Sequence, residues 1–316
     1  MASESAQPVR RRAWIPRRHE AAAAETEAHQ GTTAGFRVVE PIAPGWRHLL
    51  TRTASEYWRN RSAFRFFIQR YMRKRYGRTF FGYFWFVIPY VLPLFLGALV
   101  FGGIFAVETG GVPYFLYFLV ALGTWLFFSQ TAYFSTRSLE ISRSDIRRLY
   151  VPRLIPLTAA MTLPTIAILV YLVMLVCTLI FYVLERGEFY LVISPATLLV
   201  APGFLMLLVY AWAVGLWFSP LAPRARDVRR LAGYVLGIWY FLTPVMYPLS
   251  QIPSGWQFLA SLNPVTAPIE MVKIGLLDYG DVTTLGVISY FVGLVITLAV
   301  GIYIFLPRER QDVAFY

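Results

Sequence analysis

Six long stretches of the sequence contain no Asp, Glu, Lys or Arg, and no other feature limits the possible folds so strongly. Each has roughly the 20 residues that a helix rising 1.5 Å per residue needs to cross a hydrocarbon core. Backbone polar groups find no water in that core, so these stretches must be helices. The composition, 57% hydrophobic and 15% charged, also lies outside the range of soluble domains. The sequence predicts an all-α integral membrane protein with six transmembrane helices, at residues 83–105, 112–136, 154–184, 195–221, 231–249 and 285–306.

The positive charges are distributed unevenly among the segments between these spans. If the N-terminus is cytoplasmic, all but two of the 29 Lys and Arg residues lie in cytoplasmic segments, and only Arg186 and Lys273 lie outside. Such a bias is the positive-inside pattern of membrane proteins. It predicts a multi-pass membrane protein with cytoplasmic N- and C-termini. The net charge of +12 is then a sign of topology, and we expect no nucleic-acid partner.

Residues 1–45 differ from the rest of the chain. They hold few large apolar residues and charges of both signs, and no apolar stretch follows their arginines. Low hydrophobicity of this kind predicts a mobile cytoplasmic tail, and it does not fit a secretion signal. Residues 46–316 are expected to form the membrane domain.

A basic amphipathic segment, residues 63–80, precedes the first predicted span. Its apolar positions recur at helical spacing, at Phe64, Phe67, Ile68, Tyr71 and Met72. The pattern predicts an interface helix with its apolar face in the acyl region and its cations toward phosphates and water. A second interpretation is that the charge only anchors the first span. The cations available for membrane lipids and lipid headgroups are Arg70, Arg73, Lys74, Arg75 and Arg78.

The segment between the second and third spans reads RSLEISRSDIRRLYVPRLIP. Ser142 or Ser144 can cap a short helix, Asp145 falls in its first turn, and Pro152 with Pro156 is expected to stop it. A short basic helix at this place is suited to transmit motion from a cytoplasmic partner. An ordinary solvated connector is the other interpretation. The second cytoplasmic loop, SPLAPRARDVRRL, has a similar composition.

The outer segment 252–277 is apolar enough to enter a membrane, but Asn263-Pro264 and then Pro268 are expected to interrupt it. It also carries Glu270 and Lys273. Two short helices that enter the membrane and return fit this pattern better than a seventh span. Re-entrant backbone is tolerated where it is buried in protein or lines a polar cavity, so the segment is expected to cap a pathway from the outside. A passive interfacial loop is the alternative.

Several classes of function lack their required residues. None of the six spans carries an acidic, basic or histidine residue, whereas ion-coupled transporters usually need such groups at membrane depth. The sequence shows no phosphate-binding loop, no zinc-protease or serine-hydrolase motif and no paired-cysteine metal motif. We therefore expect no catalytic residue, no metal site and no cofactor in this chain. Another polypeptide would have to supply the energy for uphill transport.

The order of these segments resembles the membrane subunit of type-2 ATP-binding-cassette (ABC) exporters. The resemblance is to the branch that exports lipid-linked polysaccharides such as O-antigen, capsule, teichoic acid and cell-wall galactan. It covers residues from about 63 to the C-terminus and consists of five stretches in the family's order: RYMRKRYGRTFFGYFW, VPYFLYFLVALGTWLFFSQ, DIRRLYVPRLIPL, FSPLAPRARDV and FLTPVMYPLSQIPSGWQFLASLNPVTAPIE.

The resemblance implies an assembly and a set of roles. Two permease chains would form a homodimer with two cytoplasmic ABC ATPase chains, which would hold the ATP and Mg. Segment 252–277 would be a pair of outer gate helices, with Trp256, Asn263, Pro264 and Glu270 as gate residues. The helix that meets the ATPase would consist of Ser144, Asp145, Ile146, Arg147, Arg148, Leu149 and Tyr150.

The implied function is export of a lipid-linked polysaccharide from the cytoplasm across the plasma (inner) membrane, through a channel between the two permease chains. Sugar rings present C–H faces that pack on aromatic rings, and the candidate channel aromatics are Tyr83, Trp85, Trp125, Trp239, Tyr240 and Tyr247. Each could instead belong to the interfacial aromatic belt. Three other functions stay open here: a type-2 exporter of small lipids or drugs, a membrane-embedded glycan-processing enzyme, and a structural membrane scaffold.

Overall fold

The computed structural model describes residues 55, 57–76, 84–149 and 151–311, and these residues form helices without any strand. The predicted tail, residues 1–45, lies outside them. The helices are α3 (Arg61–Tyr76), α4 (Phe84–Gly97), the π-helix η1 (Ala98–Ile104), α5 (Tyr114–Ile141), α6 (Arg143–Leu149), α7 (Leu154–Ala160), α8 (Thr162–Arg186), the 3-10 helix η2 (Pro195–Leu199), α9 (Val200–Phe218), α10 (Arg226–Leu242), the 3-10 helix η3 (Leu249–Gln251), α11 (Ser254–Leu262), α12 (Thr266–Leu277) and α13 (Thr284–Gln311).

Four helical stretches are long and apolar enough to cross a membrane: Tyr114–Ile141, Leu154–Arg186, Pro195–Phe218 and Thr284–Leu306. They correspond to four of the six predicted spans. The first predicted span contains α4 and η1, whose apolar part is the shorter helix Tyr90–Ile104. The fifth overlaps α10, which has only 17 residues. Six spans therefore remain a prediction, while the all-helical membrane architecture is confirmed.

The predicted fifth span, 231–249, does not have the expected limits. Its helix α10 begins earlier, at Arg226, and ends at Leu242, where Thr243 is already extended. Pro244 and Pro248 follow, and proline can neither donate a helical hydrogen bond nor fit behind the preceding turn. The expectation of a helix through residue 249 is therefore wrong.

The break expected at Pro268 does not occur, whereas the short helix that Pro152 and Pro156 were expected to stop, α6, ends before them at Leu149. Pro156 is the third residue of α7, and Pro268 is the third residue of α12. The first N–H groups of a helix have no intrahelical partner, so a proline in the first turn loses no helical hydrogen bond. The expected break at Asn263-Pro264 does occur, between α11 and α12.

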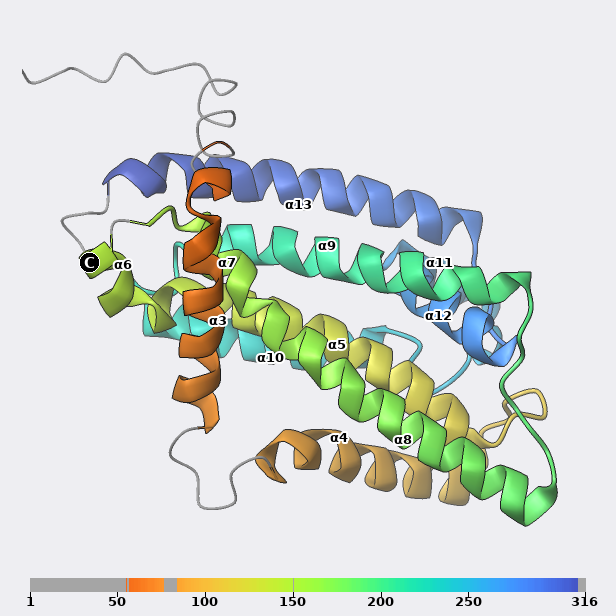
Figure 1. The fold of residues 1–316 in the computed structure, drawn as a ribbon. Helices are drawn as coiled ribbons and strands as arrows, with labels where there is room; N and C mark the ends of the chain where they lie inside the picture. The colour runs from red at the N-terminus through yellow and green to blue at the C-terminus, as the bar shows by residue number, and fades with distance from the viewer. Residues whose placement is uncertain (1–54, 56, 77–83, 150, 312–316) are drawn as a thin grey trace, which may run out of the picture. The chain divides into compact units, whose positions relative to one another are not determined.

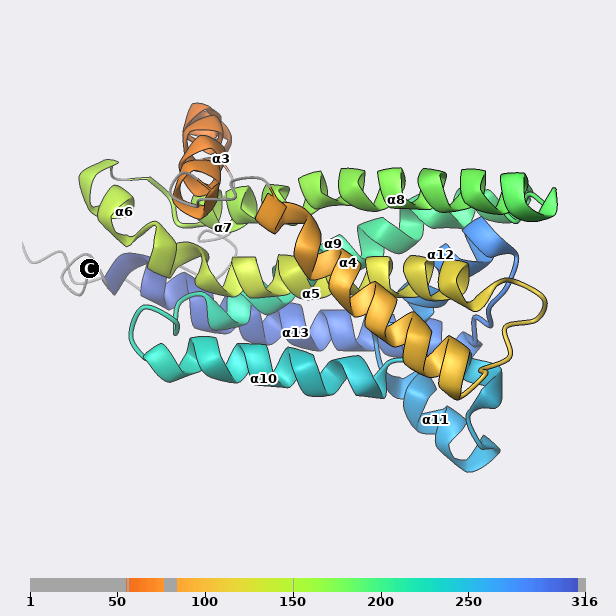
Figure 2. The same cartoon turned by 90° about the horizontal axis from the view of Figure 1, so that it is seen from below.

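The helix α5 lies at the centre of the packing, and α8, α9, α10 and α12 all contact it. The long helices run side by side in both ribbon views (Figure 1, Figure 2). Close approach depends in part on small residues: a Cβ on Gly215 of α9 would lie 2.5 Å from the Cβ of Ser135 on α5. In contrast, α8 exposes large apolar side chains such as Leu169, Val173 and Phe181, as a lipid-facing helix does.

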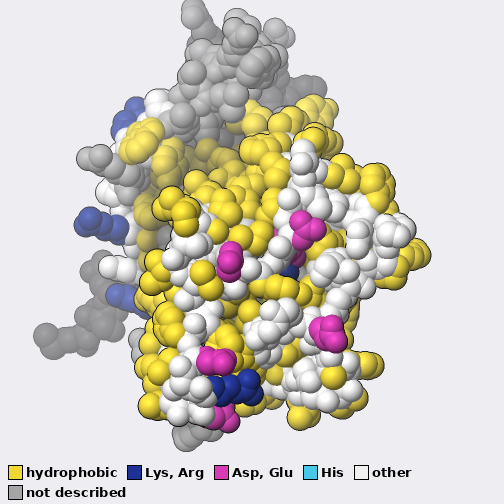
Figure 3. All heavy atoms as spheres, turned by 90° about the vertical axis from the view of Figure 1, so that its right-hand side faces the viewer, with side chains coloured by type: hydrophobic (Ala, Val, Ile, Leu, Met, Phe, Trp, Pro, Cys, Tyr) yellow, Lys and Arg dark blue, Asp and Glu magenta, His cyan; other side chains and the backbone are white. Residues whose placement is uncertain are grey.

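Short helices occupy the two ends of this bundle. The helix α3 runs across one end, where α6 and α7 also lie, and α11 and α12 lie at the other (Figure 1, Figure 2). Figure 3 shows the second end, where acidic side chains are scattered over an apolar surface. The exposed acidic residues of the outer loops are Glu108, Glu185, Glu188, Asp278 and Asp281.

The amphipathic segment forms a helix as predicted, but its apolar face has a different partner. Phe67 and Tyr71 of α3 are buried against Ile155, Ala159 and Leu163, on α7 and the start of α8. The expectation that this face lies in the acyl region is therefore wrong, because the chain itself covers it. The predicted C-terminal part of the segment, residues 77–80, lies outside the described residues.

Candidate functional site

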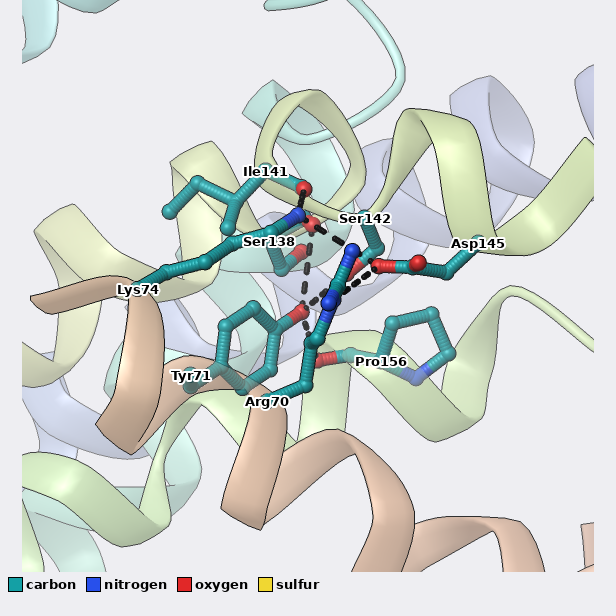
Figure 4. Close-up of polar contacts among 8 residues, drawn as sticks. All are labelled: Arg70, Tyr71, Lys74, Ser138, Ile141, Ser142, Asp145 and Pro156. Carbon is teal, nitrogen blue, oxygen red and sulfur yellow. Dashed lines mark hydrogen bonds and ion pairs between the residues drawn. The ribbon is translucent and has the colours of Figure 1, made fainter. Parts of the chain in front are cut away.

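The predicted coupling helix is present as α6, and its acidic residue is buried. Asp145 lies in the first turn of α6 and is 6% exposed. Its Oδ2 atom lies 3.1 Å from Arg70 Nε and 3.3 Å from Lys74 Nζ, both on α3. Lys74 also donates to the Ile141 carbonyl at the end of α5, at 2.5 Å. Two predicted headgroup cations are therefore directed at α6, which sequence analysis did not foresee (Figure 4).

A tyrosine from the apolar stripe of α3 completes this cluster. The Tyr71 hydroxyl lies 3.1 Å from the Ser138 carbonyl, 3.0 Å from the Pro156 carbonyl and 2.6 Å from Ser142 Oγ (Figure 4). Burial raises the pKa of Tyr71, so the hydroxyl keeps its proton. Its one hydrogen faces two carbonyls, and Ser142 can donate to its oxygen. Tyr71 thus joins α3 to the end of α5 and to α7. We call Arg70, Tyr71, Lys74, Ser142 and Asp145 the inner cluster.

The other predicted coupling residues are only partly visible. Ser144 is exposed, and Ile146 packs with Leu139, Leu157 and Phe305 where α5, α7 and α13 meet. The side chains of Arg147, Arg148 and Leu149 and all of Tyr150 lie outside the described residues. Ser142, expected as a possible cap, directly precedes α6, and its hydroxyl contacts Tyr71.

Of the other predicted headgroup cations, Arg73 is the one whose side chain the structure describes. Arg73 is exposed on α3, whereas the side chain of Arg75 and all of Arg78 lie outside the described residues. Headgroup binding by these three residues stays a prediction.

The start of α10 contacts the same end of α5 through another ion pair. Arg229 of α10 lies 2.8 Å from Glu140 Oε1, and Arg137 lies 3.6 Å from the other oxygen of Glu140. All three side chains are about one-third exposed. Thus α3, α6 and α10 all meet α5 at its C-terminal end.

At the opposite end, Asn263 connects three segments. Its side-chain oxygen accepts from Trp239 Nε1 at 2.8 Å and from the Val265 amide at 3.1 Å, while its Nδ2 donates to Thr243 Oγ1 at 2.8 Å. The predicted gate residue Asn263 therefore fixes the turn between α11 and α12 to the end of α10. Trp256 is exposed on α11, and Pro264 lies in the same turn.

The predicted gate residue Glu270 is fully buried, and so is Lys273 one turn later. The two form an ion pair inside the protein. Lys273 Nζ also donates to Tyr117 Oη at 3.1 Å and lies 5.0 Å from the centre of its ring. The sequence alone shows that Lys273 lies in this segment, but its partners are evident only in the structure.

Two of the predicted channel aromatics line one pocket. Trp125 and Tyr240 form part of a cavity of about 400 Å³ between α4, α5 and α10. Ser129, Gln130 and Tyr133 add polar groups to its wall. Trp239 instead packs its ring against Phe128, with centroids 5.4 Å apart, and so lies away from this pocket.

The other predicted aromatics give no support for a shared lining. Tyr247 donates to the Phe241 carbonyl at 3.1 Å. Tyr83 and the side chain of Trp85 lie outside the described residues. Among the described residues no group of three or more His, Cys, Asp or Glu is placed to hold a metal ion.

Comparisons with known proteins cover most of the part described above. A family model described as "ABC-2 type transporter" matches residues 62–277, from α3 through α12. The chain is 24% identical over 226 residues to the O-antigen export system permease protein RfbA of Myxococcus xanthus, an alignment that covers 69% of this chain and 81% of that relative. Two proteins of the same name from Klebsiella pneumoniae are 24% and 25% identical over 240 residues, covering 74% of this chain and 87% of each relative.

Proposed function

Because the chain belongs to the ABC-2 type transporter family, we propose that this multi-pass membrane protein is the permease subunit of an ATP-driven exporter of lipid-linked polysaccharide. The substrate class rests on the relatives, which carry the name O-antigen export system permease. Export would run from the cytoplasm across the plasma (inner) membrane, with the cation-rich end of the helices and both termini in the cytoplasm. The chain would act as a homodimer with two ABC ATPase subunits, which would bind the ATP and Mg.

The inner cluster is the observation that carries this proposal. A seven-residue helix between two membrane helices cannot transmit force if it is loosely attached. Here α6 is held through the buried Asp145 and the neighbouring Tyr71 contacts, which connect it to α3, α5 and α7. Movement of the ATPase subunits against α6 would therefore displace the ends of these helices together.

The pocket beside α5 is the candidate contact for the glycan. Trp125, Tyr133 and Tyr240 present aromatic surface, and Ser129 and Gln130 present hydrogen-bonding groups. Sugar rings use both kinds of contact, and weak exchangeable contacts suit a polymer that slides. The exposed Arg73, with Arg75 and Arg78, would supply charge for a lipid-pyrophosphate head near the cytoplasmic entrance.

The first test is assembly with an ATPase. The chain, expressed with its genomic neighbours and purified in mild detergent, should retain an ATP-binding subunit in equal amount and show ATPase activity. Asp145→Ala should uncouple or release that subunit. Asp227→Ala is the matched control, because Asp227 also lies in the first turn of a helix near the same end but its side chain is 89% exposed. A chain that purifies alone, with no ATPase able to bind it, would contradict the proposal.

The second test concerns the substrate. In proteoliposomes that contain the complete complex, a lipid-linked polysaccharide should stimulate ATP hydrolysis and appear in the lumen. Trp125→Ala and Tyr240→Ala should reduce this transport while the ATPase subunit stays bound. Stimulation by small lipids or drugs, but not by lipid-linked glycan, would favour the small-molecule exporter instead.

A further inference from the structure

The outer end of the molecule contains a charge pair in an unusual environment. Glu270 and Lys273 lie on α12 with spacing i,i+3, and both side chains are 0% exposed. Removal of two charges from water is unfavourable by several kcal/mol per ion, and buried pairs are often no more stable than apolar replacements. Stability alone is therefore a weak reason for this pair.

The pair is also bonded to segments other than its own helix. Lys273 Nζ donates to Tyr117 in the first turn of α5 and lies 3.4 Å from the Pro244 carbonyl, just after α10. Glu270 Oε2 accepts from the Asp281 amide, 3.0 Å away, in the turn before α13. We call Tyr117, Pro244, Glu270, Lys273 and Asp281 the outer clamp.

The backbone beside the pair is shaped for this contact. Gly280 has φ +153°, a conformation that side chains rarely adopt, and a Cβ there would lie 2.8 Å from Glu270 Oε2. The turn before α13 can therefore reach the carboxylate only because residue 280 has no side chain. The contact depends on three separated parts of the chain: the start of α5, the segment after α10 and the turn before α13.

The inner cluster and the outer clamp contact opposite ends of α5. Tyr117 is in the first turn of α5, and Ser138 and Ile141, which accept from Tyr71 and Lys74, are in its last turn. The 21 residues from Tyr117 to Ser138 correspond to about 32 Å of helix. Since α5 is also the most enclosed of the four long helices, it is a stiff link between α6 at one end and α12 at the other.

We propose that Glu270 and Lys273 are positioning residues that make the outer helix α12 move with α5, so that displacement of α6 by the ATPase reaches the outer segment. This inference rests on the proposed exporter function. It goes beyond that function in naming the contact that carries the movement. Each charge of the pair has the other as its partner and neither is exposed, so the pair fits a mechanical role better than an ion-carrying one.

The experiment measures movement at the outer segment. Leu262 is the exposed last residue of α11, separated from α12 by three residues, so Leu262→Cys in a Cys177→Ser background provides one spin-label position per permease chain. Electron-spin distance measurements on the complete complex in nanodiscs, with and without ATP and vanadate, report the separation of the two labels. The test variant is Glu270→Gln with Lys273→Met, which removes both charges together and so leaves neither buried alone. The matched control is Asp227→Asn with Arg230→Gln, an exposed ion pair of the same i,i+3 spacing.

In the background and the control, ATP should change the label distance. In the test variant the change should disappear and transport should fall about tenfold, while ATPase assembly and ATP hydrolysis stay within about twofold of the background. A label distance that still responds to ATP as in the background would overturn the clamp. If the background itself binds no ATPase, the exporter proposal fails and the clamp fails with it.

The double variant could also fold poorly, so a milder variant gives a second reading of the clamp. Tyr117→Phe keeps the ring under Lys273 and removes only the hydroxyl. It should reduce the amount of substrate transported per ATP hydrolysed. A purely structural effect would instead lower transport and ATP hydrolysis in the same proportion, because less complex would be folded, and would leave that ratio unchanged. An unchanged ratio in Tyr117→Phe would count against the clamp even if the double variant cannot be purified.

Discussion

The inner cluster and the outer clamp are both polar groups at the ends of α5, but they differ in exposure. In the inner cluster the side chains of Arg70 and Lys74 are 42% and 34% exposed, and Asp145 binds them from a buried position. In the outer clamp both charges are fully buried. Water can replace the inner charge contacts when they separate, whereas it cannot reach the outer pair. This difference predicts that salt weakens the inner contacts more than the buried outer pair.

The largest effect is expected where one buried charge loses its partner. Lys273→Ala should leave Glu270 unpaired and lower the free energy of unfolding by about 3–5 kcal/mol. Glu270→Gln with Lys273→Met should restore most of that loss. Thermal unfolding of the detergent-purified complex measures both. Equal stability of the single and the double variants would show that Glu270 does not need Lys273.

The next effect concerns the backbone that reaches the clamp. Gly280→Ala should destabilise by about 1–3 kcal/mol, because the positive φ is strained for alanine and its Cβ would collide with Glu270 Oε2. Gly255→Ala is a control at an exposed glycine with open space around its Cβ position. Urea or thermal unfolding should separate the two variants. If Gly280→Ala and Gly255→Ala have the same stability, the Glu270 side chain can move away from residue 280 without lowering the free energy of unfolding.

A smaller effect is expected from a single hydroxyl of the inner cluster. Tyr71→Phe keeps the ring but leaves two carbonyls and Ser142 without their partner, which corresponds to about 1–3 kcal/mol. We expect transport per ATP hydrolysed to fall while the ATPase still co-purifies. Tyr234→Phe, on an exposed tyrosine of α10, should change neither quantity. Normal transport by Tyr71→Phe would remove this residue from the coupling site.

The smallest effect is expected from the half-exposed cations. Arg70→Gln or Lys74→Gln should each change stability by less than about 1 kcal/mol, and the change should shrink near 1 M salt, where the screening length falls to about 3 Å. The Lys273→Ala effect should persist at the same salt. Unfolding at low and high ionic strength checks both. If salt changed the effects of the inner-cluster and outer-clamp variants equally, the difference in exposure would not explain the difference between the two sites.

Much of the fold could be predicted because its signals are local. Apolar runs gave the membrane helices, the 3.6-residue spacing gave α3, and Asn263-Pro264 gave the break between α11 and α12. One failure was also local: Pro268 was expected to interrupt a helix and instead lies in the first turn of α12. Proline is compatible with a first turn and incompatible with a later one, and the sequence does not state where a helix starts.

The partners of the polar residues could not be predicted in the same way. Tyr71 had the spacing of an apolar stripe and proved to hold α5 and α7 together. Arg70 and Lys74 were assigned to lipid headgroups and bind Asp145. Lys273 was recognised only as an unusual charge. The longest-range of these contacts join residues from 67 to 156 positions apart in the chain, and periodicity carries no information at such distances.

The sequence by itself therefore determined the membrane class, the order of the helices and the resemblance to a family, because burial in lipid requires continuous apolar helices whatever their neighbours are. Only the tertiary structure decided which charges meet. Pairing depends on how helices cross and which faces they bury, and a single helix can present the same residue to lipid, to water or to another helix. In this protein the packing around α5 brings the inner cluster together at one end of the helix and the outer clamp at the other.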